Sequence, residues 1–301
     1  MSSIELGEFP FTRGDFSAIP IEDYVDTSFG KVKVSIYGDR SKKDAIVTFH
    51  DLGMDGDNNF QNFFQFGTIQ EIGKQFCIYN INAPGQHIDA DPLGENYSFP
   101  SMDGLAQIVD TVVNHYDLKK FIGMGVGAGS NVLLRYALKH QNILTALILI
   151  NADCGVASWL EWGYEKTNLY LLNSKGMNNF TVNYLMWHNF GKREDECDTE
   201  VIHQYRSYYA NRPNPQNLSM YMEAFLNRTE IVLQEPANSK TATPEFTHLE
   251  SAYLTTCLGY FTHLNVRKAV DSLTKGSDEG ASCAIKTVEN VTELSHDSSA
   301  F

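Results

Sequence analysis

The sequence lacks the long apolar runs and the basic clusters that mark two large classes of protein. No stretch of its 301 residues approaches the ~20 consecutive apolar residues of a transmembrane helix. Lys and Arg number 23 against 37 Asp and Glu, which gives a formal net charge of −14. Nucleic acids and anionic membrane surfaces are bound through a basic footprint. We therefore predict no integral membrane segment and no nucleic-acid partner.

Cysteine and histidine are too scattered for a disulfide framework or a metal centre. The five cysteines include no C-x-x-C pair and the nine histidines include no H-x-x-x-H pair, so we predict no metal and no cofactor. The stretch MSSIELGEFPFTRGD has no apolar secretory core, and Ser2 stands where N-myristoylation requires glycine. A reducing compartment and a cytoplasmic location are expected.

What is present is an alternation of apolar strands and helices. Strands are predicted at residues 31–37, 44–49, 76–81, 120–124 and 145–151. Helices are predicted at about 101–116, with Ser101 as N-cap, and at about 130–140. This order predicts an α/β fold with a mostly parallel sheet and helices on both faces.

The pattern changes near residue 156, where strand-like runs stop. Amphipathic helices are predicted at about 158–175, 179–190, 196–210 and 216–227, which together indicate a helical cap inserted into the sheet domain. Beyond a linker near 235, a strand at 251–259, a helix at 262–275 and a strand at 283–289 are expected. The predicted organisation is an N-terminal arm (1–30), the first part of the core (31–155), the cap (156–235) and a divergent C-terminal part with a loose tail (236–301).

The stretch 119-KKFIGMGVGAGSNVLLRYAL-138 combines a strand, alternating glycines and a helix. Read as Gly123-x-Gly125-x-Gly127, it has the spacing of the nucleophile elbow of hydrolases, with Gly125 where the nucleophile should be. A dinucleotide fingerprint, Gly123-x-Gly125-x-x-Ala128, also fits, but the acid it requires would be Asp153, which comes too late. We favour a tight strand-to-helix turn, a degenerate elbow without a nucleophile.

The loop His50-Asp51-Leu52-Gly53 follows the strand predicted at 44–49. In hydrolases a loop at this place supplies a backbone N–H that binds an oxyanion, so His50 and Gly53 are candidates for a vestigial oxyanion loop. The aspartate opposes a negative charge there. A hydrogen-bonded His50–Asp51 pair that stabilises the loop is the favoured interpretation.

The predicted cap is rich in aromatic residues and contains an acidic run at 194–200. For the tryptophans at 159, 162 and 187, packing of the helices against the core is favoured over a ligand pocket. The acidic run is interpreted as a solvated helix start. We expect the outer face of the cap to bind protein partners, with exposed Glu194, Asp195, Tyr208 and Tyr209 as candidate contacts.

Several segments together resemble the N-myc downstream-regulated (NDR) family, in order from about residue 20 to 230. They are HDLGMDGDNNFQNFF, NINAPGQHIDA, YSFPSMDGLAQIVDTVV, FIGMGVGAGSNVLLRYAL and LILINADCGVASWLEWGYEK. The resemblance implies an α/β-hydrolase fold with a helical cap, in a family generally regarded as non-enzymatic. It also implies roles in stress response, growth control, differentiation, and signalling or trafficking.

The C-terminal part departs from the hydrolase plan. Gly259-Tyr260 stands where the plan has the triad acid, and 290-NVT-292 stands where the histidine loop should begin. A non-catalytic adaptor in cytoplasmic signalling is therefore the leading hypothesis. Two alternatives stay open: an enzyme that uses other acid/base groups, for instance Asp153 or His87, and a nucleotide-binding protein.

Overall fold

The computed structural model describes residues 20–41, 44–65, 75–94, 96–191, 194, 197–232 and 252–255. Within them, strands form a single sheet in the order β1-β2-β4-β3-β5-β6-β7. β3 lies parallel to β4 and β5, β6 lies parallel to β5 and β7, and β1 and β2 add an antiparallel edge. The strands are Ile21–Thr27 (β1), Gly30–Tyr37 (β2), Ala45–Phe49 (β3), Cys77–Ile81 (β4), Phe121–Val126 (β5), Leu144–Ile150 (β6) and Ala252–Thr255 (β7).

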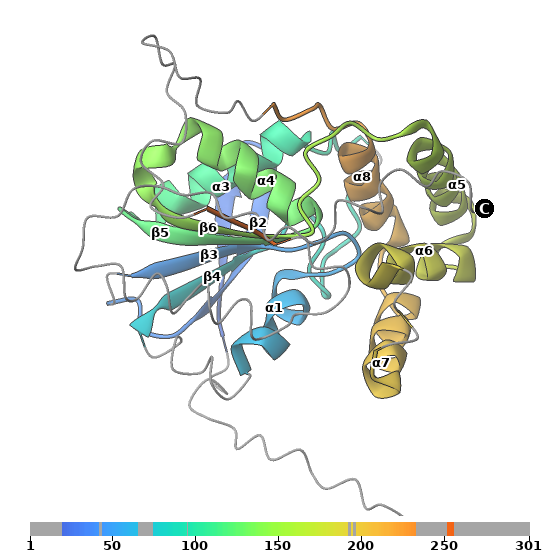
Figure 1. Cartoon of the computed structure of the whole chain (residues 1–301), viewed down its shortest axis with the longest axis horizontal. Helices are drawn as coiled ribbons and strands as arrows, with labels where there is room; N and C mark the ends of the chain where they lie inside the picture. The colour runs from blue at the N-terminus through green and yellow to red at the C-terminus, as the bar shows by residue number, and fades with distance from the viewer. Residues whose placement is uncertain are drawn as a thin grey trace, which may run out of the picture.

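The central strands are apolar throughout because helices cover both faces of the sheet, as Figure 1 shows. Helices α3 (Met102–His115) and α4 (Ala128–Lys139) lie on one face, and α1 (Gly56–Gln65) lies on the other. Alternate residues of β6 point to the two cores: Leu147 and Leu149 pack with α3 and α4, whereas Ile148 packs with Phe60 of α1. The predicted fold class is confirmed.

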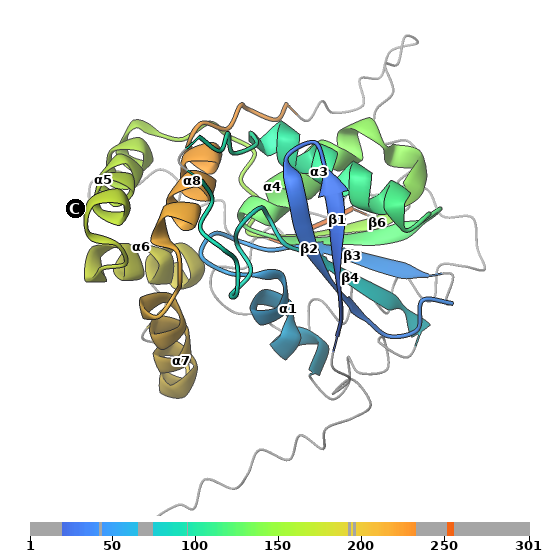
Figure 2. The same cartoon turned by 180° about the vertical axis from the view of Figure 1, so that it is seen from behind.

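The predicted cap helices are present as α5 (Trp159–Lys175), α6 (Asn179–Phe190), α7 (Thr199–Ala210) and α8 (Pro215–Leu226). They gather at one end of the sheet in both Figure 1 and Figure 2. α5 begins with a capping box between Ser158 and Glu161, and α5 and α6 end at Gly176 and Gly191, both with positive φ. α7 begins three residues later than predicted, because the Asp198 side chain caps it by accepting from Glu200 N–H.

Two longer elements, β1 and α1, were not predicted, and neither was the short 3-10 helix Gln141–Ile143. β1 lies inside residues 1–30, where we expected only an arm; its sequence IEDYVDT has one buried residue, Val25, so no alternating pattern marks it. α1, GDNNFQNFFQ, is rich in polar residues and buries mainly phenylalanines. β7 falls inside the strand predicted at 251–259. The elements predicted at 262–275 and 283–289, and Tyr260, lie outside the described residues, and the domain boundaries stay predictions.

Candidate functional site

The turn between β5 and α4 has the backbone of a nucleophile elbow, centred on Gly127. β5 ends at Val126 and α4 begins at Ala128, and Gly127 between them has φ 51° and ψ −116°. Gly125, which we predicted as the elbow centre, lies within β5. That assignment is wrong, because the centre is the next glycine of the repeat, Gly127. Glycines at four alternate positions allow two readings of G-x-G-x-G, and only the end of the strand distinguishes them.

The glycines on either side of Gly127 are required by close backbone contacts. A Cβ on Gly129 would lie 2.0 Å from the carbonyl oxygen of Phe49, at the end of β3. A Cβ on Gly125 would lie 2.7 Å from the carbonyl oxygen of Gly129. Both contacts are with backbone, which cannot move aside, so the motif is Gly125-x-Gly127-x-Gly129 with Gly127 in the place of the nucleophile.

The carboxylate of Asp51 lies in the elbow itself. Its Oδ1 accepts hydrogen bonds from the N–H of Leu52, at 2.7 Å, and from the N–H of Ala128, at 2.9 Å. A Cβ on Gly127 would lie 2.0 Å from the same oxygen. In α/β-hydrolases the oxyanion is bound by the N–H of the residue after the nucleophile and by an N–H of the loop after β3. Those are the two donors that Asp51 occupies.

The predicted hydrogen bond between His50 and Asp51 is present, but it joins the His50 ring to the backbone carbonyl of Asp51 and not to its carboxylate. His50 Nε2 accepts from the N–H of Ala83, at 3.0 Å, so Nδ1 carries the proton and donates to the backbone carbonyl of Asp51, at 2.8 Å. Burial lowers the pKa of His50 to about 4, which keeps the ring neutral. His50 therefore ties the loop after β3 to the loop after β4. Gly53, the other predicted loop residue, has φ 74° and lies against Leu185 of the cap.

The partner of Asp51 comes from the cap. His188 of α6 places Nε2 3.1 Å from Asp51 Oδ2, and the Asp51 side chain is only 1% exposed. Burial opposes the charged form of His188, but the neighbouring Asp51 outweighs it and raises the pKa to about 9. His188 was not among the predicted site residues, because one histidine within a helix carries no pattern that connects it to a loop 137 residues away.

Behind His188 lies a second buried acid. Glu165 of α5 is fully buried and accepts a hydrogen bond of 2.7 Å from the hydroxyl of Tyr184. Burial raises the pKa of Glu165 to about 7, although the hydrogen bond from Tyr184 and the charge of His188 favour the ionised form. The Tyr184 and His188 rings stack with centroids 6.1 Å apart. Buried polar groups thus continue from the elbow into the cap.

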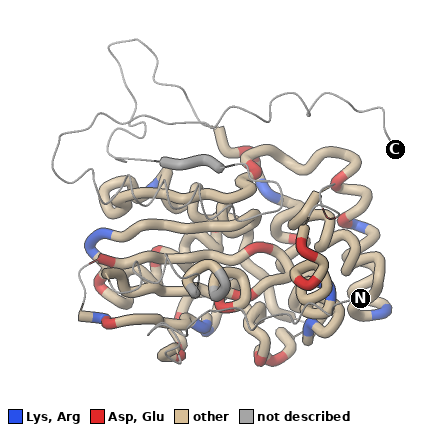
Figure 3. Tube along the Cα trace, turned by 60° about the horizontal axis from the view of Figure 1, so that its bottom comes forward, with Lys and Arg blue, Asp and Glu red and all other residues tan. Residues whose placement is uncertain are grey.

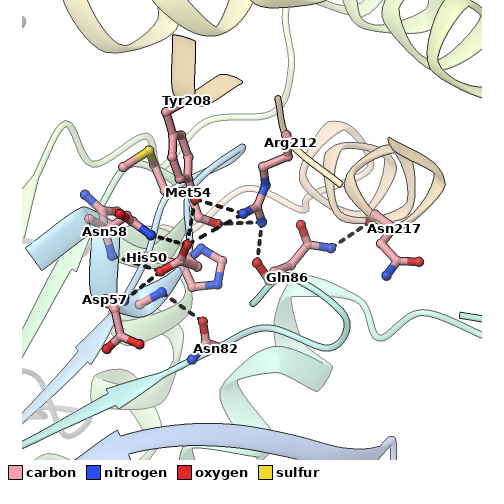
Figure 4. A network of polar contacts seen from close by, with 12 residues as sticks. His50, Met54, Asp57, Asn58, Asn82, Gln86, Tyr208, Arg212 and Asn217 are labelled. Atoms are coloured by element: carbon pink, nitrogen blue, oxygen red, sulfur yellow. Dashed lines mark hydrogen bonds and ion pairs between the residues drawn. The ribbon is translucent and has the colours of Figure 1, made fainter. Parts of the chain in front are cut away.

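A buried polar network fastens the cap to the loops that follow β3 and β4 (Figure 4). Arg212, between α7 and α8, donates to the carbonyl oxygens of Met54, at 3.1 Å, and Gln86. Tyr208 donates to Asp55 Oδ2 at 2.6 Å, and Arg212 lies 3.7 Å from the same oxygen. Burial opposes ionisation of Asp55, but hydrogen bonds from Tyr208 and Asn58 and the charge of Arg212 lower its pKa.

This network changes the residues available for partner binding. Tyr209 is fully buried and accepts a hydrogen bond from Asn189 at 2.7 Å, so our expectation that it is exposed is wrong. Tyr208 is partly buried against Asp55 and is not a free surface residue either. Glu194 forms an ion pair of 2.7 Å with Arg206. Asp195 lies outside the described residues.

The cap tryptophans are exposed, contrary to the packing that we favoured. Trp159 is 85% exposed, Trp162 52% and Trp187 51%. Helix α6, from which Trp187 projects, carries no Asp, Glu, Lys or Arg, and its charged His188 is turned inward to Asp51. The cap buries its leucines, methionines and tyrosines instead, including Leu172, Leu185, Met186, Tyr184 and Tyr209.

The acid/base candidates of the alternative enzyme hypothesis are engaged elsewhere. Asp153 Oδ2 lies 2.6 Å from Arg228, and Oδ1 accepts from Gly155 N–H. His87 packs edge-on against Tyr24, and burial lowers its pKa. Among the described residues neither side chain is hydrogen-bonded to the elbow. Within the same residues, no group of three or more His, Cys, Asp or Glu is placed to hold a metal ion.

The sheet order, the cap and the glycine with positive φ between β5 and α4 define a protein of the α/β-hydrolase fold. Among solved structures, a thermophilic esterase from Thermogutta terrifontis is similar with a TM-score of 0.56 and 15% identity, covering 71% of this chain and 74% of that one. An epoxide hydrolase from metagenomes of hot environments is similar with a TM-score of 0.58 and 12% identity, covering 88% of this chain and 100% of that one. At such identities the likeness shows the fold alone.

The chain belongs to the Ndr family, whose model matches residues 22–292. It is 32% identical to Protein NDRG2 of Bos taurus over 74% of this chain and 61% of that protein. It is 32% identical to Protein NDRG3 of Xenopus tropicalis over 71% of this chain and 54% of that protein. The chain thus spans about three-fifths or less of the length of these curated relatives. No helix in the described residues is long and apolar enough to cross a membrane.

Proposed function

We propose that this protein is a non-catalytic member of the α/β-hydrolase fold that acts as an adaptor for protein partners. The observation that carries the proposal is the elbow: Gly127 supplies no nucleophile, and the Asp51 carboxylate occupies both backbone donors that would bind an oxyanion. Removal of a single triad member already lowers the rate of hydrolysis by orders of magnitude. Here the nucleophile and access to the oxyanion donors are lost together.

The same carboxylate argues against the nucleotide-binding alternative. A dinucleotide fingerprint uses the N-terminal N–H groups of the helix after the first strand to bind a pyrophosphate. At the start of α4, the N–H of Ala128 is already bonded to Asp51, which carries the same sign of charge as a phosphate. A phosphate there would displace one anion with another, and the loss of the Asp51 hydrogen bonds would oppose it.

The cellular role that we propose follows from membership in the family. It is an adaptor in cytoplasmic signalling, stress response or differentiation, with the cap as the partner-binding part. Two observations support the cap: its exposed tryptophans are residue types that anchor protein interfaces, and α6, which carries one of them, has no Asp, Glu, Lys or Arg. Lys and Arg lie scattered among acidic positions in the view of Figure 3, which favours a protein partner over a polyanion.

The absence of catalysis is tested with short-chain nitrophenyl esters. Purified protein should hydrolyse them no faster than a heat-inactivated sample. Ester turnover that follows the folded protein through purification, and that falls in Asp153→Asn or His87→Gln, would instead establish the alternative enzyme. Partner identification by affinity purification, compared between the wild-type chain and the cap variants described in the Discussion, tests the adaptor role.

A further inference from the structure

The outer face of helix α5 consists of Trp159, Gly163, Thr167, Tyr170 and Ser174. Their spacing of three or four residues places them along one side of the helix. All five are exposed, Trp159 by 85% and Tyr170 by 69%. α5 lies on the side of the cap away from the sheet in Figures 1 and 2, and its opposite side packs on α8 and α6. Within the described part of the chain, the outer face of α5 is therefore uncovered.

Gly163, in the middle of this face, is not explained by contacts among the described residues. Glycine in a helix interior costs about 1 kcal/mol relative to alanine. A Cβ added to Gly163 would meet nothing within 4 Å, whereas a Cβ on Gly125 or Gly129 would meet backbone at 2.7 or 2.0 Å. On a helix surface, glycine lets a second backbone approach closely. The position suits a neighbour from outside the described chain.

The hydroxyl groups of the outer face already have hydrogen-bond partners. Thr167 Oγ1 donates to the carbonyl oxygen of Gly163, at 3.0 Å, and Ser174 Oγ donates to that of Tyr170, at 2.7 Å. Covering a polar group is costly when it loses its hydrogen bond to water and gains no other. Here both hydroxyls keep a bond to their own helix, so the face can be covered without that loss.

Charge also distinguishes the outer face of α5 in a chain with a net charge of −14. The helix has two acids and neither lies on this face: Glu165 is buried, and Glu161 is paired with the buried Arg228 at 3.0 Å. Lys166, beside the face, is paired with Glu223 of α8 at 3.4 Å. Two copies of an acidic protein repel each other least where such a surface has no free carboxylate.

We propose that a second copy of this chain covers the outer face of α5, through an antiparallel contact between the two α5 helices. A two-fold axis then sets Gly163 opposite Thr167 of the second copy, and Trp159 opposite Tyr170 of the second copy. An enclosed aromatic side chain buries about 200 Å², so the exposed parts of Trp159, Trp162 and Tyr170 supply on the order of 400 Å². That is half of the ~800 Å² that each partner buries in a standard interface, so the dimer is weak and reversible.

Sedimentation velocity measures this dimer directly. The purified protein should be a monomer at about 1 μM and mainly a dimer at about 100 μM, as expected for a small transient interface. Thr167→Glu should weaken the dimer at least tenfold, because two like charges then face each other across the axis. Thr111→Glu is the matched control, since Thr111 of α3 also donates to a carbonyl four residues earlier, that of Gln107, at 3.0 Å. This variant should dimerise like the wild-type protein.

A mixture of opposite charges tests the symmetry of the contact. Thr167→Lys alone should also be a monomer at about 100 μM, and an equimolar mixture of Thr167→Glu and Thr167→Lys should recover the dimer, because opposite charges then meet across the axis. Thr167 is exposed, so both variants should keep the circular dichroism spectrum of the wild-type protein.

Three results would overturn the proposal: a wild-type protein that stays monomeric at about 100 μM, a dimer that Thr167→Glu and Thr111→Glu affect equally, and a charge mixture that stays monomeric. The inference deepens the adaptor proposal, because it rests on the cap as the partner-binding part and names one partner. The two are judged separately. A monomeric protein that captures other partners would keep the adaptor role and lose the α5 contact, and a dimer that captures none would do the reverse.

Discussion

At the scale of single residues, the elbow combines a backbone conformation that favours glycine with a buried carboxylate on its two backbone donors. The φ of 51° at Gly127 is in the region where residues with a Cβ are strained, and the space beside its Cα is taken by Asp51. The elbow conformation has therefore persisted without the nucleophile that it presents in hydrolases. Two predictions follow from the contacts of Asp51.

Gly127→Ala should lower the free energy of unfolding by about 2–5 kcal/mol, because the new Cβ is strained and overlaps the Asp51 carboxylate. Urea unfolding measures the change. In the double variant Asp51→Gly/Gly127→Ala the overlap is gone. Its loss of unfolding free energy should therefore be smaller than the sum of the losses in the two single variants. Gly163→Ala is the matched control: nothing lies within 4 Å of its added Cβ in helix α5, and it should be neutral or slightly stabilising. Equal losses at the two glycines would contradict the elbow geometry.

The second residue-scale prediction concerns pH. The pKa of His188 is raised from 6.5 to about 9, so its stabilising effect is complete below pH 6.5 and is lost as the pH rises toward 9. The pKa of Glu165 is raised from 4.5 to about 7, so its ionisation lowers stability between pH 4.5 and 7. Urea unfolding from pH 4.5 to 9.5 should therefore show stability falling in two overlapping ranges.

Variants assign each range to its residue. His188→Gln should remove the fall between pH 6.5 and 9, and Glu165→Gln should remove the fall between pH 4.5 and 7, with some coupling because the two charges interact. His203→Gln, at an exposed position of the cap helix α7, should keep the wild-type profile. A His188→Gln profile that still falls above pH 6.5 would show that His188 is not the group responsible.

At the scale of elements, hydrogen bonds from α8 and from the segment before it hold the cap on the sheet domain. Arg212 donates hydrogen bonds to two backbone carbonyls of the core loops. The Asn217 side chain of α8 accepts a hydrogen bond from Leu93 N–H and donates to the backbone carbonyls of Gly85 and Asp91. Tyr221 of α8 also donates to the carbonyl of His50, at 3.1 Å. These bonds join the cap to the loops after β3 and β4, which are the loops that surround the elbow.

Arg212→Ala should therefore loosen the cap. The substitution removes the cation beside the buried Asp55 and leaves the Met54 and Gln86 carbonyls without their Arg212 donor, a loss of about 3 kcal/mol or more. Hydrogen exchange should show faster exchange in α7 and α8 than in β3, β5 and β6. Arg206→Ala is the matched control, because Arg206 is 43% exposed and pairs with Glu194 at the surface. A similar increase of the exchange rate of α7 and α8 in both variants would show that Arg212 has no specific role in holding the cap.

At the scale of the whole molecule, the exposed aromatic residues concentrate on the cap. Trp159, Trp162, Tyr164, Tyr170, Phe180 and Trp187 are all more than a third exposed, and all belong to α5 or α6. This reverses the prediction from sequence, which places the tryptophans inside and Tyr208 and Tyr209 outside. The exposed tryptophans now take the place of the buried tyrosines as candidate partner contacts. That the cap binds partners stays a prediction.

Partner capture should depend on these side chains and not on the elbow. In affinity purification, Trp159→Ser/Trp162→Ser should reduce recovery of partners at least several-fold, because interface tryptophans contribute about 2 kcal/mol or more each. Tyr24→Ser, which removes an exposed aromatic from the edge strand β1 outside the cap, and Asp51→Asn, inside the elbow, should leave recovery unchanged. Loss of partners in Asp51→Asn but not in the tryptophan variant would place the binding site in the old cleft.

The sequence by itself determined the elements and their kind. Apolar runs identified β2 to β6, and local signals such as Ser101 at the start of α3 and glycines at the ends of α5 and α6 placed helix termini to within a few residues. These features depend on neighbours within a turn or two of the chain. The missing nucleophile was also readable, because every residue at the turn from 123 to 129 is glycine, alanine, methionine or valine.

Only the tertiary structure decided which glycine is the elbow centre and what fills the site. The bond from Ala128 to Asp51 joins residues 77 apart, and the contact of Asp51 with His188 spans 137 positions. The exposure of Trp159 and the burial of Tyr209 likewise depend on how four helices pack, since α5 and α6 carry aromatic residues on more than one face. Helix and strand propensities depend on nearby residues and do not predict such contacts, which arise from the packing of the cap on the sheet domain.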